Sequence, residues 1–323
     1  MTNARGCAPP ALKAGNTNKP AAFPAHQMAD LIQVSEHCYY FSGPTQVGLV
    51  RTADDEVCLI DSGCDKSAGR AVRKALEARG WRLSAIYCTH SHADHIGANR
   101  FLSERTGCRI YAPEVECAFT RHTLLEPSLL YGGCPHNGLR SKFLMAEPSA
   151  AEPLCPEALP PSLSVLPLPG HSPDMVGYCS HEGVIYPGDC LASRATLDKY
   201  RICYIYDVAA YLRSLESLIS MQAACFVPAH AEATDDIAPL ARYNIEQVHA
   251  VARCILSHCR KPIGTDELLR RVADSFGISL TIGQHALVGS TLRSYLAWLC
   301  DDGRLTPSIE DNRLLWLSAD SSD

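Results

Sequence analysis

The amino-acid sequence predicts a mixed α/β protein in which two packed sheets carry helices on their outer faces and a smaller α+β domain follows. Short apolar segments typical of strands come first, and strands then alternate with helical segments. Single ligand-type side chains recur directly after short apolar runs. From about residue 239 the pattern changes to three helical segments and a hairpin. The chain has 323 residues, more than a typical single domain, so two domains are expected.

The first part of the chain consists of a tail and then of regularly spaced strands and helices. Residues 1–28 are rich in alanine, proline, asparagine and glycine, so we expect a disordered tail. Ser67 suits the N-cap of a helix that Gly80 ends. Strands are expected over residues 32–34, 38–41, 45–50, 57–60, 83–88, 109–111, 163–168, 183–185 and 224–226, and helices over residues 67–79, 99–106, 113–123 and 208–220.

One short motif contains four metal-ligand side chains within six positions. It reads His-x-His-x-Asp-His over residues 90–95, with apolar residues before it and Gly97 after it. Imidazole and carboxylate groups together suit zinc and other borderline divalent ions. A strand ending at Cys88 and a tight loop would direct these side chains to one point. The candidate ligands here are His90, His92, Asp94 and His95.

Three more candidate ligands lie downstream, each after a short strand and a turn. His171 follows Pro169-Gly170, Asp189 follows Pro187-Gly188, and His230 follows Pro228-Ala229. Each side chain is therefore expected at the carboxyl end of a strand. A chance cluster of histidines would not explain this downstream repetition, so the sequence predicts a metal centre.

With the histidine motif, His171, Asp189 and His230 present and in order, residues 29–232 resemble the hydrolase branch of the metallo-β-lactamase superfamily, specifically its glyoxalase II-like members. The resemblance implies an αββα sandwich, here assigned to residues 29–236, and two divalent metal ions, with zinc expected and iron or manganese as alternatives. His90, His92 and His171 would hold one ion, Asp94, His95 and His230 the other, and Asp189 would bridge them. Asp94 and Asp189 are the candidate catalytic residues, because they would position a metal-bound hydroxide as the nucleophile. Asp61 would orient the ligand imidazoles, although it could instead cap the next helix.

Two segments are candidates for substrate contacts. The proline-rich insertion at residues 124–161 is too long for an ordinary loop, and long loops near a site tend to be lids or binding segments. The segment after Asp189 mixes basic and aromatic residues, which suits anionic substrate groups. The alternative is that these side chains only pack on the sandwich or face solvent. The candidates are Tyr131, Arg140, Lys142, Lys199 and Tyr204.

Residues 237–318 form the predicted second domain, and residues 319–323 form a tail. Helices are expected over residues 239–259, 265–276 and 285–300, followed by a hairpin around residues 310–312. Three helices and a hairpin resemble a winged-helix domain. Between Ala238 and Leu317 there are nine basic and eight acidic residues, so this domain lacks the basic surface that a groove reader needs.

The leading functional hypothesis is a metal-dependent hydrolase of a small-molecule ester, thioester or lactone. The alternatives are an RNA or DNA phosphodiesterase and a DNA-binding regulator that senses a ligand. Diiron oxygen-reducing relatives typically have a glutamate where this chain has His92, which favours hydrolysis, whereas iron sulfur-dioxygenases keep a similar histidine set. The net charge of −6 does not favour nucleic acid as a partner.

Composition also bears on compartment and partners. No run of 18 apolar residues is present and residues 1–28 lack a signal-peptide core, so neither membrane insertion nor secretion is expected. The sixteen cysteines include no Cys-x-x-Cys pair, which argues against a zinc-finger framework. We expect a cytoplasmic protein with reduced thiols, and a homodimer is an open alternative to a monomer.

Overall fold

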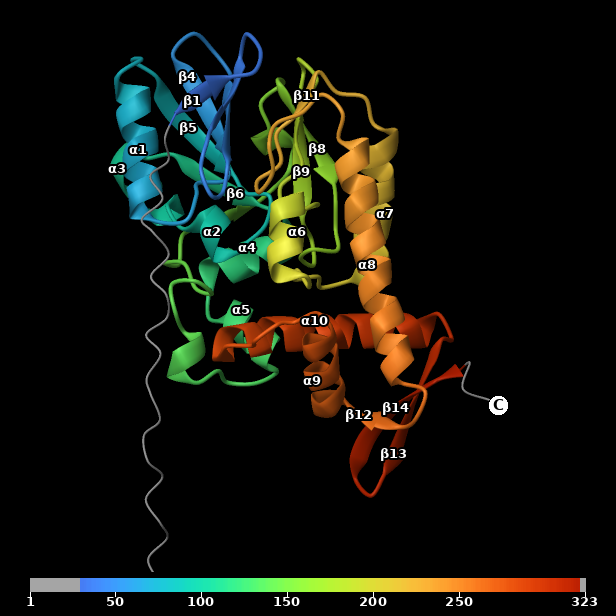
Figure 1. Ribbon diagram of the computed structural model, residues 1–323. Helices are drawn as coiled ribbons and strands as arrows, with labels where there is room; N and C mark the ends of the chain where they lie inside the picture. Colours follow the sequence, from blue (N-terminus) through green and yellow to red (C-terminus); the bar gives the residue numbers. More distant parts are fainter. Residues whose placement is uncertain (1–29, 320–323) are drawn as a thin grey trace, which may run out of the picture.

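The computed structural model describes residues 30–319, so the predicted N-terminal tail and residues 320–323 lie outside the described part of the chain. Its first layer of strands is a seven-stranded sheet in the order β1-β2-β3-β4-β5-β6-β7 (Figure 1). Strands β1 to β4 pair antiparallel, whereas β4 to β7 pair parallel. The strands are β1 (Leu31–Gln33), β2 (Cys38–Phe41), β3 (Val47–Arg51), β4 (Glu56–Ile60), β5 (Arg82–Tyr87), β6 (Arg109–Ala112) and β7 (Glu152–Pro153).

A four-stranded sheet in the order β11-β10-β9-β8 packs against the first sheet. One apolar cluster joins the two sheets, with Val50 and Ile60 from one side and Tyr178 and Tyr186 from the other. Gly48 is required at this interface, because a Cβ atom there would lie 2.6 Å from the Tyr186 ring. The strands are β8 (Leu163–Pro167), β9 (Val176–Ser180), β10 (Val184–Tyr186) and β11 (Cys225–Phe226).

Helices cover the outer faces of both sheets, which gives the predicted αββα layering (Figure 1). Asp65, rather than the predicted Ser67, caps the first helix, since its side chain accepts a hydrogen bond from the Ser67 backbone N–H. Both residue types suit an N-cap, so the sequence did not distinguish them. Helices α1 (Lys66–Glu77), α3 (Asn99–Thr106) and α4 (Glu114–Arg121) lie on one side, and α7 (Val208–Ser220) and α8 (Ala238–His258) lie on the other.

Two segments expected to be irregular contain short helices. The insertion at residues 124–161 holds α5 (Leu125–Tyr131), the 3-10 turns η1 (Asn137–Leu139) and η2 (Pro156–Ala158), and β7. Pro127 lies in the first turn of α5, where a missing N–H costs no helical hydrogen bond. The segment after Asp189 contains α6 (Arg194–Tyr200), and α2 (Ala93–Ile96) lies within the histidine motif itself.

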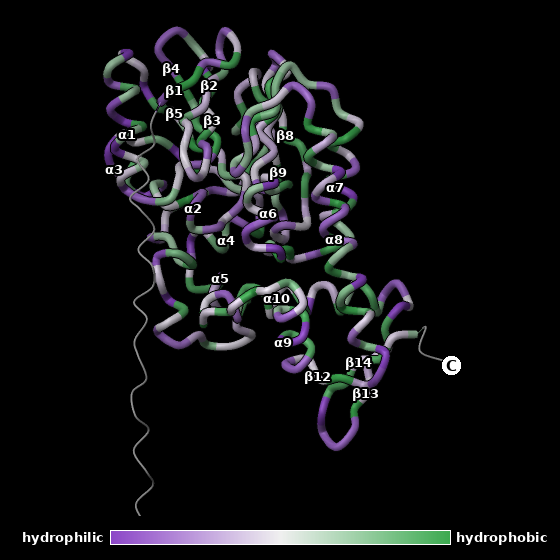
Figure 2. The backbone as a smooth tube through the Cα atoms, in the orientation of Figure 1, coloured by the Kyte–Doolittle hydropathy of each residue, from purple (hydrophilic) through white to green (hydrophobic). Residues whose placement is uncertain are grey.

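The C-terminal part begins with α8 and continues through α9 (Thr265–Ser275) and α10 (Ile282–Asp301). A small sheet of β12 (Ile263–Gly264), β13 (Leu305–Glu310) and β14 (Arg313–Ser318) has the order β12-β14-β13. Figure 2 shows a hydrophilic tip on the β13–β14 hairpin. Helix α10 starts three residues earlier than predicted, because Thr281 and Gln284 form a capping box.

The C-terminal helices share a hydrophobic core with the sandwich. A single cluster of buried side chains runs from Ile185 and Phe226 in the four-stranded sheet through α7 and α8 to Leu268 in α9 and Leu296 in α10. The predicted domain boundary at residues 236–237 falls at the start of α8, which packs along α7 before it continues into the C-terminal part. No helix among residues 30–319 is long and apolar enough to cross a bilayer.

The loop that carries the histidine motif is held by a close backbone contact at Gly97. A Cβ atom on Gly97 would lie 2.1 Å from the carbonyl oxygen of Cys64. We therefore expect Gly97→Ala to lower the free energy of unfolding by about 1–3 kcal/mol, because the backbone must move to relieve the clash. Urea-induced unfolding measures this change. Gly283→Ala is the matched control, since a Cβ atom there meets nothing within 4 Å. Equal stability of the two variants would contradict the close contact.

Candidate metal centre

The seven predicted ligands lie in four loops that follow strands. The loop after β5 carries the His-x-His-x-Asp-His motif, and the loops after β8, β10 and β11 carry His171, Asp189 and His230. These loops meet at one edge of the sandwich, as expected for side chains at the carboxyl ends of strands. The structure therefore brings together residues that are separated by up to 140 positions, since His90 and His230 lie at the extremes.

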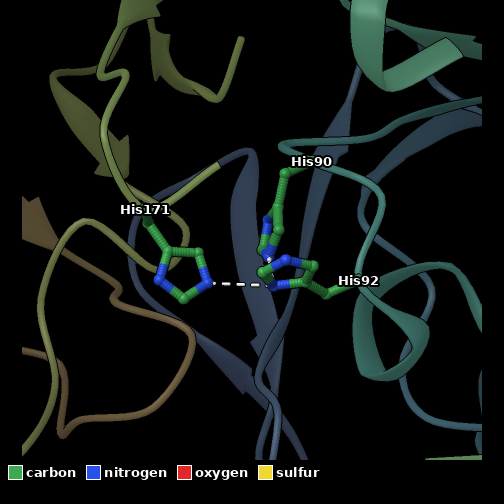
Figure 3. Close-up of side chains that lie close together, drawn as sticks. All are labelled: His90, His92 and His171. Atoms are coloured by element: carbon green, nitrogen blue, oxygen red, sulfur yellow. Dashed lines mark hydrogen bonds between the residues drawn. The ribbon is translucent and has the colours of Figure 1, made fainter. Parts of the chain in front are cut away.

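Three histidines form the first group of donor atoms. The Nε2 atom of His90 lies 3.0 Å from the Nδ1 atom of His92, and the Nε2 atom of His171 lies 2.9 Å from that same Nδ1 atom. Figure 3 shows the three rings turned toward one another, His90 and His92 from the loop after β5 and His171 from the loop after β8. Three imidazole nitrogens facing a common point can hold a divalent ion such as zinc.

The second group shares Asp189 with the first. The Nε2 atom of His230 lies 3.2 Å from Asp94 Oδ2 and 3.3 Å from Asp189 Oδ2. The other oxygen of Asp189, Oδ1, lies 3.1 Å from His95 Nε2. The same Oδ2 atom of Asp189 also lies 3.5 Å from His171 Nε2, in the first group. Asp189 thus lies between the two groups, where one carboxylate can reach ions in both.

Two buried atoms test whether these residues fit a metal. His95 Nε2 and Asp189 Oδ1 are both buried and lie 3.1 Å apart, yet neither makes a hydrogen bond of acceptable geometry among the described residues. A buried polar atom without a partner is costly unless something else satisfies it. Both atoms point into the shared centre, and imidazole nitrogen with carboxylate oxygen is a donor set that suits zinc, so the residues fit divalent ions.

The buried carboxylate of Asp61 is connected by hydrogen bonds to ligand histidines of both groups. Its Oδ1 atom accepts a hydrogen bond from the Thr89 backbone N–H at 2.7 Å, and its Oδ2 atom accepts one from the Thr89 hydroxyl at 2.8 Å. The Nδ1 atom of His95 lies 2.8 Å from the same Oδ2 atom. The Thr89 hydroxyl also lies 2.9 Å from His90 Nδ1, which connects Asp61 to a second ligand. Asp61 therefore fixes the orientation of His90 and His95, and it caps no helix.

His171 and His230 also have hydrogen-bond acceptors next to the ring nitrogen that faces away from the centre. His171 Nδ1 lies 3.1 Å from the Tyr204 carbonyl oxygen, and His230 Nδ1 lies 2.7 Å from the Pro44 carbonyl oxygen. These contacts direct the other ring nitrogen, Nε2, toward the centre. Such outer contacts set both the tautomer and the ring orientation of a ligand histidine.

Two glutamates that are buried beside the centre, Glu116 and Glu126, were not predicted from the sequence. Glu116 accepts hydrogen bonds from the Ser91 hydroxyl at 2.6 Å and the Ser172 hydroxyl at 2.7 Å, so it joins the loops that carry the first and third histidines. Glu126, on α5, lies 3.5 Å from His92 Nε2, and burial together with repulsion from Glu116 raises the pKa of Glu126 to about 8. Glu116 lies on a predicted helix, where a lone glutamate is typical of an exposed position, and Glu126 lies in the insertion that was expected to be irregular.

Electrostatics divide the histidines into two classes. Burial and the neighbouring imidazoles lower the pKa of His90 well below its usual value, and burial followed by the His92 imidazole lowers the pKa of His171 to about 3. Burial opposes protonation of His95 and His230 too, but the nearby carboxylates outweigh it and raise the pKa of both. His90 and His171 are thus held neutral, which is the form that binds metal.

One of the five predicted substrate contacts lies beside the histidines. The Tyr204 ring centroid is 5.4 Å from that of His92 and 5.7 Å from that of His171. The others make contacts elsewhere: Tyr131 packs against His136, the Arg140 guanidinium donates to the Pro135 carbonyl oxygen, and Lys199 lies over the Tyr200 ring. Lys142 is exposed.

Comparison with known proteins gives matches in sequence and in fold. Residues 41–230 match the model of the metallo-beta-lactamase superfamily. A hydroxyacylglutathione hydrolase from Thiobacillus denitrificans is 33% identical over 116 residues, which is 36% of this chain and 36% of that protein. A second, from Rhizobium meliloti, is 44% identical over 54 residues, or 17% of this chain and 21% of its own length. These matches span about a fifth to a third of the relatives' length.

Solved structures extend the likeness in fold to most of the chain. A metallo-beta-lactamase family protein from Thermus thermophilus superposes with a TM-score of 0.65 at 20% identity, over 85% of this chain and 93% of that one. A beta-lactamase domain protein from Burkholderia ambifaria gives a TM-score of 0.68 at 16% identity, over 90% and 95%. The family match covers more than half of the chain and includes all seven clustered donor residues, so this protein belongs to the metallo-β-lactamase superfamily.

Proposed function

We propose that this protein is a dinuclear metal-dependent hydrolase that acts on a small-molecule thioester, with esters and lactones as related substrates. The observation that carries the proposal is the position of Asp189 between two groups of donor atoms, each able to hold one ion. The partial matches to hydroxyacylglutathione hydrolases support a thioester in particular. Zinc is the ion we propose, because imidazole donors predominate.

The residues around the centre have distinct roles in this proposal. His90, His92 and His171 would hold one ion, and Asp94, His95 and His230 the other. Ions bound there would supply a water-derived nucleophile at neutral pH and polarise the scissile carbonyl group. Asp189 would fix the separation of the two groups. Asp94 would be held in place by the Thr45 hydroxyl, which donates to its Oδ2 atom at 3.0 Å.

The C-terminal part would form one wall of the substrate site. The Ile205 backbone N–H donates to the Thr291 hydroxyl at 3.4 Å, which joins the segment next to Tyr204 to α10. Leu130 of α5 and Ala286 of α10 belong to one small buried cluster, and Tyr204 packs on it. The order of elements from α8 to β14, with the sheet order β12-β14-β13, supports a winged-helix-like domain. In this protein we propose that the domain shapes the pocket.

The burial of α10 argues against a nucleic-acid substrate or operator. A winged-helix domain reads DNA through its third helix, which has to enter the major groove. Here Val288, Leu292, Tyr295 and Leu299 of α10 are buried against the rest of the chain. The exposed side chains that remain on α10 are Ile282, His285, Arg293, Ala297 and Asp301, so its free face offers a single arginine where groove insertion requires several basic and polar side chains.

A substrate panel tests the proposed activity. With the zinc-loaded protein, we expect hydrolysis of acylglutathione thioesters, weaker turnover of esters and lactones, and none of structured RNA or duplex DNA. Release of free thiol measures thioester cleavage directly. Cleavage of RNA or DNA without any thioester turnover would overturn the proposal and favour a phosphodiesterase.

Asp189→Ala tests the shared carboxylate. We expect this variant to lose metal from both groups and to lose about 100-fold or more of its hydrolytic activity, since even residues behind a ligand cost 10–100-fold when changed. Elemental analysis measures the metal content, and circular dichroism measures whether the fold is retained. Asp54→Ala, on an exposed turn, is the matched control. Wild-type metal content in Asp189→Ala would sink the bridging role.

Binding of nucleic acid across a salt series tests the proposed role of the C-terminal part. We expect weak attraction at most, and we expect that attraction to fade steeply between 50 and 200 mM salt, because only phosphate contacts by exposed arginines are available. Fluorescence anisotropy with labelled duplex DNA and structured RNA measures it. Sequence-selective binding that persists at physiological salt would favour the regulator hypothesis instead.

A further inference from the structure

A second cluster of metal-ligand side chains lies outside the candidate metal centre. His37, His181 and Glu182 each offer one donor atom, and these atoms all lie within 4.8 Å of one another. His37 is in the turn between β1 and β2, whereas His181 and Glu182 are in the turn between β9 and β10. His37 is therefore held by the seven-stranded sheet, and His181 and Glu182 are held by the four-stranded sheet.

The cluster is remote from the catalytic ligands. Glu182 precedes β10 and Asp189 follows it, so the two carboxylates lie at opposite ends of that strand. His37 likewise precedes β2, whereas Pro44, whose carbonyl oxygen supports His230, follows it. An ion bound at this cluster would have no contact with the catalytic centre.

The carboxylate of Glu182 is held with one oxygen directed at the two histidines. Its Oε2 atom accepts hydrogen bonds from the Ser35 hydroxyl and from the His37 backbone N–H, the latter at 3.1 Å. Its Oε1 atom lies 2.7 Å from His37 Nδ1 and 4.0 Å from His181 Nε2. One oxygen is thus used for positioning, while the other faces both imidazoles.

The His181 ring is the member that is free to move. Its side chain is 52% exposed, and among residues 30–319 its ring makes no hydrogen bond within 3.5 Å. Its backbone is fixed, since the His181 N–H donates to the Ser162 carbonyl oxygen at 2.9 Å. In a tetrahedral zinc site with bonds of about 2.0–2.1 Å, donor atoms lie about 3.3 Å apart. The observed 2.7 and 4.0 Å bracket that spacing and the third pair of donor atoms lies within 4.8 Å, so a rotation of the exposed His181 side chain would bring its nitrogen toward the other two donors.

We propose that His37, His181 and Glu182 form a second binding site for a zinc-type divalent ion, which links the two sheets at the end of the sandwich away from the catalytic centre. Two imidazole nitrogens and one carboxylate oxygen are donors that zinc accepts, and solvent would complete the coordination. Because the donors come from both sheets, the ion stabilises their packing. It takes no part in hydrolysis.

Zinc titration of the protein with its catalytic centre already loaded tests this site. After free metal is removed, further Zn²⁺ is added against a chromophoric chelator, and bound zinc is counted per chain. We expect the wild type to bind one further ion and His181→Ala to bind it at least about 10-fold more weakly. His258→Ala, a histidine on the exposed side of α8, is the matched control and keeps wild-type uptake.

Two further measurements separate this site from the catalytic centre. Added zinc raises the thermal midpoint of the loaded wild type and of His258→Ala, but not that of His181→Ala. The loaded wild type and His181→Ala hydrolyse a test substrate at equal rates, or are equally inactive if the proposed substrate class is wrong. Absence of further zinc uptake by the wild type up to about 1 mM, or equal uptake by His181→Ala, overturns the proposal.

Discussion

The centre of this protein depends on the buried carboxylate of Asp61. It has a backbone φ of 64°, in the left-handed region that non-glycine residues rarely adopt, although aspartate tolerates it better than most. This conformation ends β4 abruptly and turns the side chain toward Thr89 and His95 instead of along the strand. Backbone strain of this kind persists only where the surroundings impose it. Here three hydrogen bonds to Asp61 offset it, and together they fix two of the seven donor side chains.

The sequence predicted which seven side chains converge, because their positions follow from strand geometry. Each one comes after a short apolar run and a turn residue, and such runs were recognisable from composition alone. The two buried glutamates beside the donor residues could not be predicted in the same way. Glu116 and Glu126 lie on helices α4 and α5, and their burial results from packing between segments distant in sequence. A single glutamate on an amphipathic helix has the same local pattern whether it faces solvent or a ligand loop.

Short helices were also missed for a physical reason. Helices α5 and α6 have seven residues each, too few for an apolar stripe to repeat. Tertiary contacts stabilise both helices. Helix α5 packs on α10, and the Tyr243 hydroxyl of α8 donates a hydrogen bond to the Asp198 carboxylate of α6. Their existence depends on the C-terminal part of the chain, which a local reading of residues 124–207 could not include. The same dependence explains why Tyr204 lies at the centre while other basic and aromatic residues nearby do not.

Helix α8 connects the sandwich to the C-terminal part as one continuous helix. It has 21 residues and is therefore about 31 Å long, and its first half lies along α7 while its second half contacts α9. A continuous helix cannot melt in its middle without exposing apolar surface on both sides, because Ala241 and Ile255 are fully buried near its two ends. Because one buried cluster runs from the sandwich through α8 to α10, we expect the sandwich and the C-terminal part to unfold as one cooperative unit. For the same reason, swinging the C-terminal part away from the sandwich as a rigid arm would expose this shared apolar core to water.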